Sequence, residues 1–157
     1  MLVEEINLRG TMSNTLKWDT RFLELAKLVA SWSKDPSTQT GAVIINKDRT
    51  IVSIGYNGFP RGMYDNQTLY NNRETKYSRI IHAEMNALLN SKQQLNDCIL
   101  YTWPLGPCDR CVVHFLQAGV TRFVFPKLSD ELKDRWYEAT EKSKKYITEM
   151  HLQYTEI

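Results

Sequence analysis

The sequence predicts an α/β fold with three layers, in which helices cover both faces of a mixed central sheet of about five strands. After an opening hairpin, β-branched runs alternate with stretches whose apolar residues recur at helical spacing. Two of the later strand-like runs, 98–103 and 121–125, are joined through a helical stretch. These two strands should therefore be parallel neighbours connected by a right-handed crossover.

The elements of the first half are predicted from apolar spacing and from helix-breaking residues. The first helix ends before Asp35-Pro36, because the residue before a proline avoids helical angles. Two β-branched runs flanking the polar turn 46–49 indicate a hairpin. The stretch that follows is long and rich in Gly, Asn, Pro and Tyr, which is typical of a functional loop. In order, we expect an arm over 1–15, a helix over about 18–32, strands over 41–45 and 50–54, and a loop over 55–72.

The second half is predicted in the same way. Gly119 suits a left-handed helix C-cap, and two prolines with a glycine make 104–107 an irregular, bent connection. The last helix is placed by its apolar stripe alone. In order, we expect a helix from about 83, a strand over 98–103, a helix over 108–118, a strand over 121–125, a helix over about 132–150 and a final strand over 152–157.

Length and composition indicate an ordinary globular domain. With 157 residues, of which 42% are hydrophobic and 24% charged, we expect one domain over 1–157 with a single core. The net charge of +2 argues against a nucleic-acid partner, and no run is long enough to span a membrane. Residues 1–10 lack the apolar stretch of a secretory signal, and only three cysteines are present. We therefore expect a cytoplasmic protein, in the host cytoplasm if the chain is viral.

The most informative residues are His82-Ala83-Glu84 and Pro107-Cys108-Asp109-Arg110-Cys111. One imidazole and two thiolates can hold zinc at three corners of a tetrahedron, leaving the fourth for water. Both segments fall at predicted helix N-termini, where the helix dipole favours thiolates, and the cysteine spacing places both sulfurs on one side of a turn. The predicted metal ligands are His82, Cys108 and Cys111, and Glu84 is the predicted catalytic proton carrier.

Each half of this pattern also has a plainer explanation. A Cys-x-x-Cys pair can be a redox dithiol or half of a structural zinc site, and His82 alone can be an ordinary helix-start histidine. Glu84 can be a first-turn carboxylate that stabilises the helix dipole. Taken together, however, a His-x-Glu followed by Pro-Cys-x-x-Cys is the signature of zinc nucleobase deaminases. We therefore interpret the two halves as one catalytic zinc site.

Four separated motifs resemble the deoxycytidylate (dCMP) deaminases of the cytidine deaminase-like superfamily, over about residues 16–125. The motifs are Ser33 to Val43, Gly55 to Gly62, His82 to Ala87, and Gln117 to Val120. The resemblance implies the cytidine deaminase-like fold and zinc-dependent hydrolysis of dCMP to dUMP and ammonia, which supplies dUMP for thymidylate synthesis. It also implies a homohexamer that is activated by dCTP with Mg²⁺ and inhibited by dTTP.

The resemblance further implies roles for individual residues. Asn57 matches an asparagine that hydrogen-bonds the sugar near the zinc, Ala83 offers backbone groups to the base, and Ser33 and Lys34 lie in a motif expected to bind substrate. The family's effector site lies in the loop of Gly55, Tyr56, Asn57, Gly58, Pro60, Arg61 and Gly62, so Asn57 can serve either pocket. Candidates for the substrate phosphate are Ser33, Lys34, Arg61, Arg73, Arg79 and Arg110.

The chain departs from the family at Trp103 to Pro107, where members have a short apolar residue and a proline, so one pocket wall should differ. Some members carry a second, structural zinc; with His114, His151 and Cys98 as the spare ligands, we expect none here. Two other functions stay open: a zinc deaminase of tRNA, single-stranded nucleic acid or a free nucleobase, and a nucleotide-binding protein with a vestigial site. The low net charge argues against the first, and an intact Glu84 argues against the second.

Overall fold

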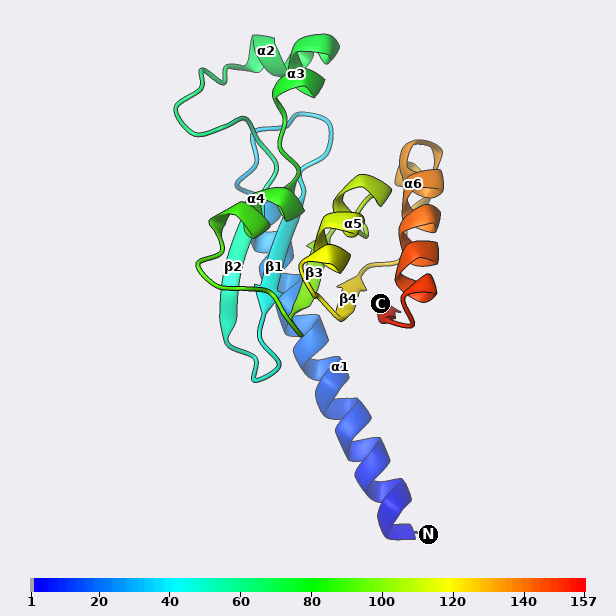
Figure 1. Ribbon diagram of the computed structural model, residues 1–157. Helices are drawn as coiled ribbons and strands as arrows, with labels where there is room; N and C mark the ends of the chain where they lie inside the picture. The colour runs from blue at the N-terminus through cyan, green and yellow to red at the C-terminus, as the bar shows by residue number, and fades with distance from the viewer. Residues whose placement is uncertain (1) are drawn as a thin grey trace.

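A five-stranded mixed sheet forms the centre of the computed structural model, which describes residues 2–157 (Figure 1). The strand order is β2-β1-β3-β4-β5. β1 pairs antiparallel with both β2 and β3, whereas β3–β4 and β4–β5 are parallel. The strands are β1 (Gly41–Ile45), β2 (Ile51–Tyr56), β3 (Ile99–Trp103), β4 (Arg122–Phe125) and β5 (Gln153–Glu156). The predicted mixed sheet is confirmed.

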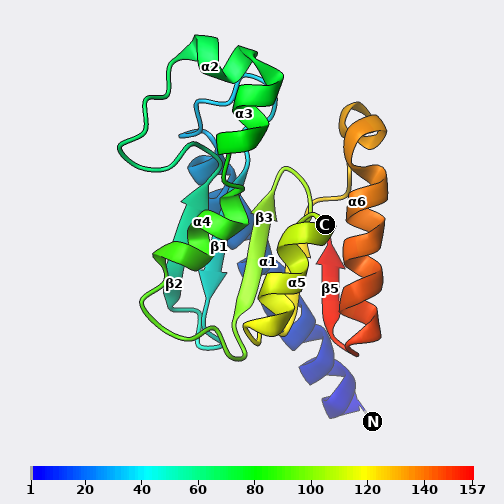
Figure 2. The same cartoon turned by 45° about the horizontal axis from the view of Figure 1, so that its top comes forward.

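Helices cover both faces of this sheet, as Figure 2 shows, with α1 behind it and α4 and α5 in front. Helix α6 packs against α5 and β5. None of the helices in residues 2–157 is both long and apolar enough to cross a membrane. The helices are α1 (Leu2–Ala30), α2 (Gln67–Asn71), α3 (Arg73–Arg79), α4 (Ala83–Asn90), α5 (Asp109–Gln117) and α6 (Asp130–Glu149).

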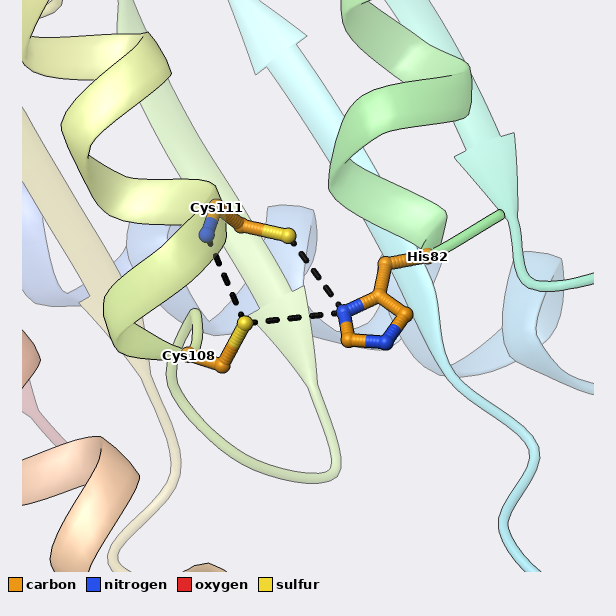
Figure 3. Close-up of side chains that lie close together, drawn as sticks. All are labelled: His82, Cys108 and Cys111. Atoms are coloured by element: carbon orange, nitrogen blue, oxygen red, sulfur yellow. Dashed lines mark hydrogen bonds between the residues drawn. The ribbon is translucent and has the colours of Figure 1, made fainter. Parts of the chain in front are cut away.

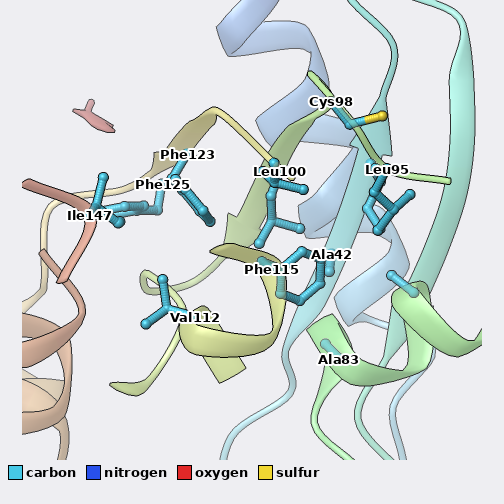
Figure 4. Packing of buried hydrophobic residues seen from close by; sticks show 13 residues of the cluster. Ala42, Ala83, Leu95, Cys98, Leu100, Val112, Phe115, Phe123, Phe125 and Ile147 are labelled. Atoms are coloured by element: carbon cyan, nitrogen blue, oxygen red, sulfur yellow. The ribbon is translucent and has the colours of Figure 1, made fainter. Parts of the chain in front are cut away.

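Strand β1 shows why the fold has three layers. All five of its residues are buried, because successive side chains point to opposite faces and both faces are covered. Ala42 and Ile44 belong to the core between the sheet and α4, α5 and α6 (Figure 4). Val43 and Ile45 face α1, where they join Phe22 and other apolar residues of a second core.

Two glycines let helices lie directly on the sheet. A Cβ added at Gly41 would lie 2.1 Å from the carbonyl oxygen of Ala26 in α1. A Cβ at Gly55 in β2 would lie 2.3 Å from the backbone nitrogen of Ala87 in α4. Contacts this short exclude any side chain, so Gly55 brings the backbone of α4 onto β2. The start of α4, which carries His82, is positioned by that contact.

A buried polar network fixes α1 to the other side of the sheet. The Arg122 guanidinium of β4 donates two hydrogen bonds to the Asp19 carboxylate, of 2.8 and 2.6 Å. The Tyr101 hydroxyl of β3 donates a third, of 2.7 Å, to the same carboxylate. A bidentate arginine–carboxylate pair has strict geometry, so the network sets the position of α1 along the strands.

Two segments differ from the sequence-based expectation. The arm expected over 1–15 is helical from residue 2, because α1 begins at Leu2 and residues 2–15 continue the helix N-terminally from its packed part. Helix propagation adds one hydrogen bond per residue, so a stretch without an apolar stripe can extend a helix that is already anchored. The loop expected over 55–72 holds the end of β2 and the short helix α2. The side chains of Asn66 and Asn72 cap α2 and α3. This capping stabilises both short helices even though neither has a full apolar stripe.

Candidate active site at the start of helices α4 and α5

Three side chains from two helix starts meet as a metal-ligand cluster (Figure 3). His82 is the N-cap residue of α4, Cys108 is the N-cap residue of α5, and Cys111 lies in the first turn of α5. The Nδ1 atom of His82 lies 3.5 Å from the sulfur of Cys108 and 3.4 Å from that of Cys111. The structure thus brings together the three predicted metal ligands.

The spacing of these atoms suits zinc. In a tetrahedral site with Zn–S near 2.3 Å and Zn–N near 2.05 Å, a sulfur and a nitrogen ligand lie about 3.6 Å apart. The two observed separations, 3.5 and 3.4 Å, are close to that value. Among the described residues the cluster has three ligands, which leaves one tetrahedral corner to solvent or substrate, as in catalytic rather than structural zinc sites.

The electrostatics of the cluster also suit a divalent cation. The pKa of Cys108 is lowered to about 4, chiefly because its sulfur accepts hydrogen bonds from Cys111 and His82. The pKa of Cys111 is raised by its hydrogen bond to Cys108 and by burial, and the pKa of His82 is raised to about 9, mainly by its hydrogen bond to Cys108. In the absence of metal, Cys108 is therefore the stabilised thiolate, and Cys111 and His82 hold the protons beside it. Zinc requires thiolates and a neutral imidazole, so its binding releases these protons.

Glu84 lies in the first turn of α4, beside the cluster, and is only 8% exposed. Burial raises the pKa of its carboxyl group to about 7, against the opposing effect of His82. A carboxyl group with a pKa near neutrality can both accept and donate a proton, which suits general acid–base chemistry. Glu84 lines the same pocket as His82 and Cys108.

Besides the metal-ligand cluster and Glu84, five parts of the chain line the pocket. Asp35, Asn57 and Thr40 form one side, and α3 contributes Lys76 and Tyr77. The segment that departs from the family pattern forms another wall through Trp103, Leu105 and Gly106, and its Trp103–Pro104 peptide is cis. Helix α6 closes the pocket with Arg135 and Trp136. The Trp136 ring meets the His82 ring edge-on, with centroids 6.5 Å apart.

Asn57 lines this pocket and is held by its own hydrogen bonds. Its side-chain oxygen accepts from the backbone N–H of Thr40, at 2.9 Å, and its amide nitrogen donates to Asp35, at 3.1 Å. Asp35 also accepts a hydrogen bond of 2.8 Å from the buried ammonium group of Lys76. Ser33 is buried beneath and donates to the Asn57 backbone carbonyl. Ser33 therefore supports Asn57 rather than lining the pocket.

The predicted phosphate candidates are dispersed. Lys34 is exposed and forms an ion pair of 3.0 Å with Asp65, so the structure places it outside the pocket. The side chain of Arg61 donates to Asn90 on the far side of the 55–62 loop. In the part of the chain that the structure describes, Arg79 and Arg110 line neither this pocket nor the two pockets next to it. Arg73 lines an adjoining polar pocket.

The 55–62 loop separates the active-site pocket from a second pocket. Of the residues predicted to bind an effector, Gly55, Tyr56, Gly58, Pro60 and Arg61 line that second pocket, together with residues of α4. Asn57 faces the active site instead, and Gly62 lies at an exposed turn with φ of 81°. The amide of Asn86 in α4 donates to the Tyr56 carbonyl at 2.8 Å, which holds the loop against α4.

Several pocket residues were not anticipated from the sequence. Lys76 and Tyr77 reach the site from α3, which comes shortly before His82 in the chain, and Arg135 and Trp136 reach it from α6, far beyond Cys111. Asp35 lies in a recognised motif, but its ion pair with Lys76 could be identified only from the folded structure. The sequence carried no signal for this pair, because the burial that makes Lys76 need a carboxylate partner is a property of the fold.

Comparison with known proteins agrees with this geometry. Residues 16–127 match the family model "Cytidine and deoxycytidylate deaminase zinc-binding region". The chain is 39% identical to an uncharacterized deaminase from the luxG 3′ region of Aliivibrio fischeri, over 88% of this chain and 92% of that protein. It is also 39% identical to the deoxycytidylate deaminase of Homo sapiens, over 76% of this chain and 68% of that protein.

A solved structure shares the fold. The dCMP deaminase of cyanophage S-TIM5, in complex with dCMP and dUMP, superposes with a TM-score of 0.69 at 19% identity, covering 90% of this chain and 97% of that one. The cytidine deaminase-like fold expected from the motifs is therefore confirmed. With a matching family model over most of its length, close relatives and a zinc-type ligand cluster, the chain belongs to the cytidine and deoxycytidylate deaminase family and is a deaminase.

Proposed function

We propose that the protein hydrolyses dCMP to dUMP and ammonia and so supplies dUMP for thymidylate synthesis. The observation that carries the proposal is a single pocket lined by His82, Cys108, the buried Glu84 and the polar side chain of Asn57. Relatives named deoxycytidylate deaminases, and the S-TIM5 enzyme with dCMP and dUMP bound, support dCMP as the substrate. The small number of cysteines supports a cytoplasmic location.

The chain's own residues supply orientation and proton transfer. Zinc, when bound by His82, Cys108 and Cys111, supplies an open coordination position at which the pKa of water falls toward neutrality. The Glu84 carboxylate accepts a proton from water, delivers it to the pyrimidine ring nitrogen and then assists the departure of ammonia. We propose that the backbone N–H of Ala83 donates to the base, because N–H groups in the first turn of a helix have no intrahelical partner.

Turnover on a panel of substrates tests the proposal. We expect the zinc-loaded protein, with dCTP and Mg²⁺ present, to deaminate dCMP, as followed by the loss of cytosine absorbance and by released ammonia. Cytosine and a cytosine-containing single-stranded oligonucleotide should react much more slowly, because the net charge of +2 offers little attraction to a polyanion. Deamination of the oligonucleotide or of cytosine with inert dCMP would contradict the proposal.

We further propose that the second pocket is an effector site for dCTP with Mg²⁺ and for dTTP, in a homohexamer. Backbone hydrogen bonds of 3.1 and 2.8 Å join Gly58 in that pocket to Ile81, the residue before His82. Asn57, on the same loop, faces the active site. A ligand that shifts this loop would therefore act on a metal ligand and on a substrate contact together.

Kinetics and mass measurement test this regulation. We expect velocity against dCMP to be sigmoidal without effector, to become hyperbolic with dCTP and Mg²⁺, and to fall with dTTP. Light scattering should give the mass of six copies. Hyperbolic kinetics that neither nucleotide changes would contradict the effector site, and a stable monomer would contradict the hexamer.

A further inference from the structure

Two arginines flank Tyr77 at the outer end of the active-site pocket. The guanidinium carbon of Arg73 lies 5.4 Å from the Tyr77 ring centroid, and a guanidinium nitrogen of Arg135 lies 3.4 Å from the Tyr77 hydroxyl. Arg73 comes from α3 and Arg135 from α6. An outer, polar pocket contains both arginines and shares Lys76, Tyr77 and Arg135 with the pocket that holds the metal ligands. The two pockets therefore adjoin each other at these shared residues.

The charge of these arginines is not neutralised. The nearby Lys76 is ion-paired with Asp35 at 2.8 Å, and both side chains are buried. By contrast, neither Arg73 nor Arg135 forms an ion pair with a carboxylate in the part of the chain that the structure describes. No acidic side chain lines the outer pocket among the described residues. Two arginine forks and a hydroxyl group around a concave, acid-free surface favour a phosphate.

The position of these groups matches the shape of a nucleotide. A pyrimidine bound beside His82, Glu84 and Cys108 would bring its sugar toward Asn57, which lines the same pocket. Its 5′-phosphate would then lie near Tyr77 and Arg135, which this pocket shares with the outer polar pocket. Trp136, next to Arg135 on α6, lines the same pocket and meets the His82 ring edge-on.

We propose that Arg135, together with Arg73 and the Tyr77 hydroxyl, binds the 5′-phosphate and makes α6 the element that selects a nucleoside monophosphate over a nucleoside. The inference rests on the proposed function. Arg135 and Trp136 lie beyond residue 127, where the match to the family model ends. Arg73 and Tyr77 lie inside the matched region, so the proposed phosphate site combines that region with a helix beyond it.

Binding of dUMP and deoxyuridine to the zinc-loaded protein, measured by isothermal titration calorimetry, tests the inference without requiring turnover. We expect Arg135→Gln to weaken dUMP binding at least about tenfold, since a hydrogen bond to a charged group is removed. Deoxyuridine binding should stay unchanged, because deoxyuridine has no phosphate. Arg73→Gln should weaken dUMP binding in the same selective way. In turnover, KM for dCMP should rise in Arg135→Gln while kcat is retained.

Two control variants separate phosphate binding from general effects. Arg135→Lys keeps the charge but loses the fork, so it should recover part of the dUMP affinity. Lys145→Gln removes a charge from an exposed position on the same helix and should leave dUMP binding unchanged. Equal losses of dUMP and deoxyuridine affinity in Arg135→Gln, or no loss of either, would overturn the inference. Selective dUMP binding through Arg135 with inert dCMP would instead overturn the proposed function and leave the phosphate site standing.

Discussion

Replacing Glu84 with glutamine is expected to lower kcat for deamination by about 10²- to 10⁴-fold, the usual contribution of general acid–base catalysis. Glutamine has nearly the same shape but cannot carry the proton. Because Glu84 is not one of the clustered ligands, zinc content should stay at the wild-type level. Steady-state turnover of dCMP, with zinc measured by atomic emission on the same sample, checks both parts.

A matched variant and a stability measurement distinguish proton transfer from a helix-dipole role. Glu24→Gln makes the same chemical change at an exposed position on α1, on the other side of the sheet, and should leave turnover unchanged. If Glu84 only stabilised the dipole of α4, Glu84→Gln would lower the free energy of unfolding by about 0.3–1 kcal/mol and leave kcat intact. Full activity in Glu84→Gln would refute its role as proton carrier.

Replacing Cys111 with serine is expected to remove the metal and, with it, activity. The substitution takes away one of two thiolates in a cluster of three ligands. Loss of an outer-shell partner already weakens metal binding about 10- to 100-fold, so loss of a direct ligand should weaken it further. The melting temperature should also fall, since a ligand that binds only the folded state stabilises it. Zinc analysis, competition with a chelator and thermal denaturation give the three readouts.

Cys98 provides the control for this experiment. It is fully buried at the edge of the core between the sheet and α5, and it is not a member of the metal cluster. Cys98→Ala should retain zinc and activity and lose only the packing of one sulfur and its weak hydrogen bond of 3.6 Å to the side-chain oxygen of Asn46. A Cys111→Ser protein with wild-type zinc content would exclude Cys111 as a ligand. Recovery of the chelated wild-type enzyme by added zinc would show that metal loss, not unfolding, stops turnover.

The metal site was predictable because its determinants are local. Cys108 and Cys111 are three residues apart, so any helix that starts there places both sulfurs on one side. His82 and Glu84 likewise follow from one helix start. A lone Cys-x-x-Cys has several explanations. The signature of zinc nucleobase deaminases resolved them, because it joins the His-x-Glu segment to the Pro-Cys-x-x-Cys segment in one site.

The substrate-binding residues were less predictable because burial decides their roles. Lys34 and Lys76 are both lysines near motif residues, yet Lys34 is exposed beside Asp65 and Lys76 is buried against Asp35. Periodicity does not distinguish these cases, because a lysine's partner is set by what the fold brings near it. The α2–α3 segment was missed for another reason: two short helices capped by asparagine carry no full apolar stripe.

The sequence by itself determined the strands, the helix starts at the zinc ligands and the chemistry those ligands can perform, because all of these depend on neighbours within one or two turns. Only the tertiary structure decided that α6 closes the pocket with Arg135 and Trp136, and that the 55–62 loop has one pocket on each side. The physical reason is distance along the chain. Contacts between segments many residues apart follow from how the layers pack, and no spacing rule encodes them.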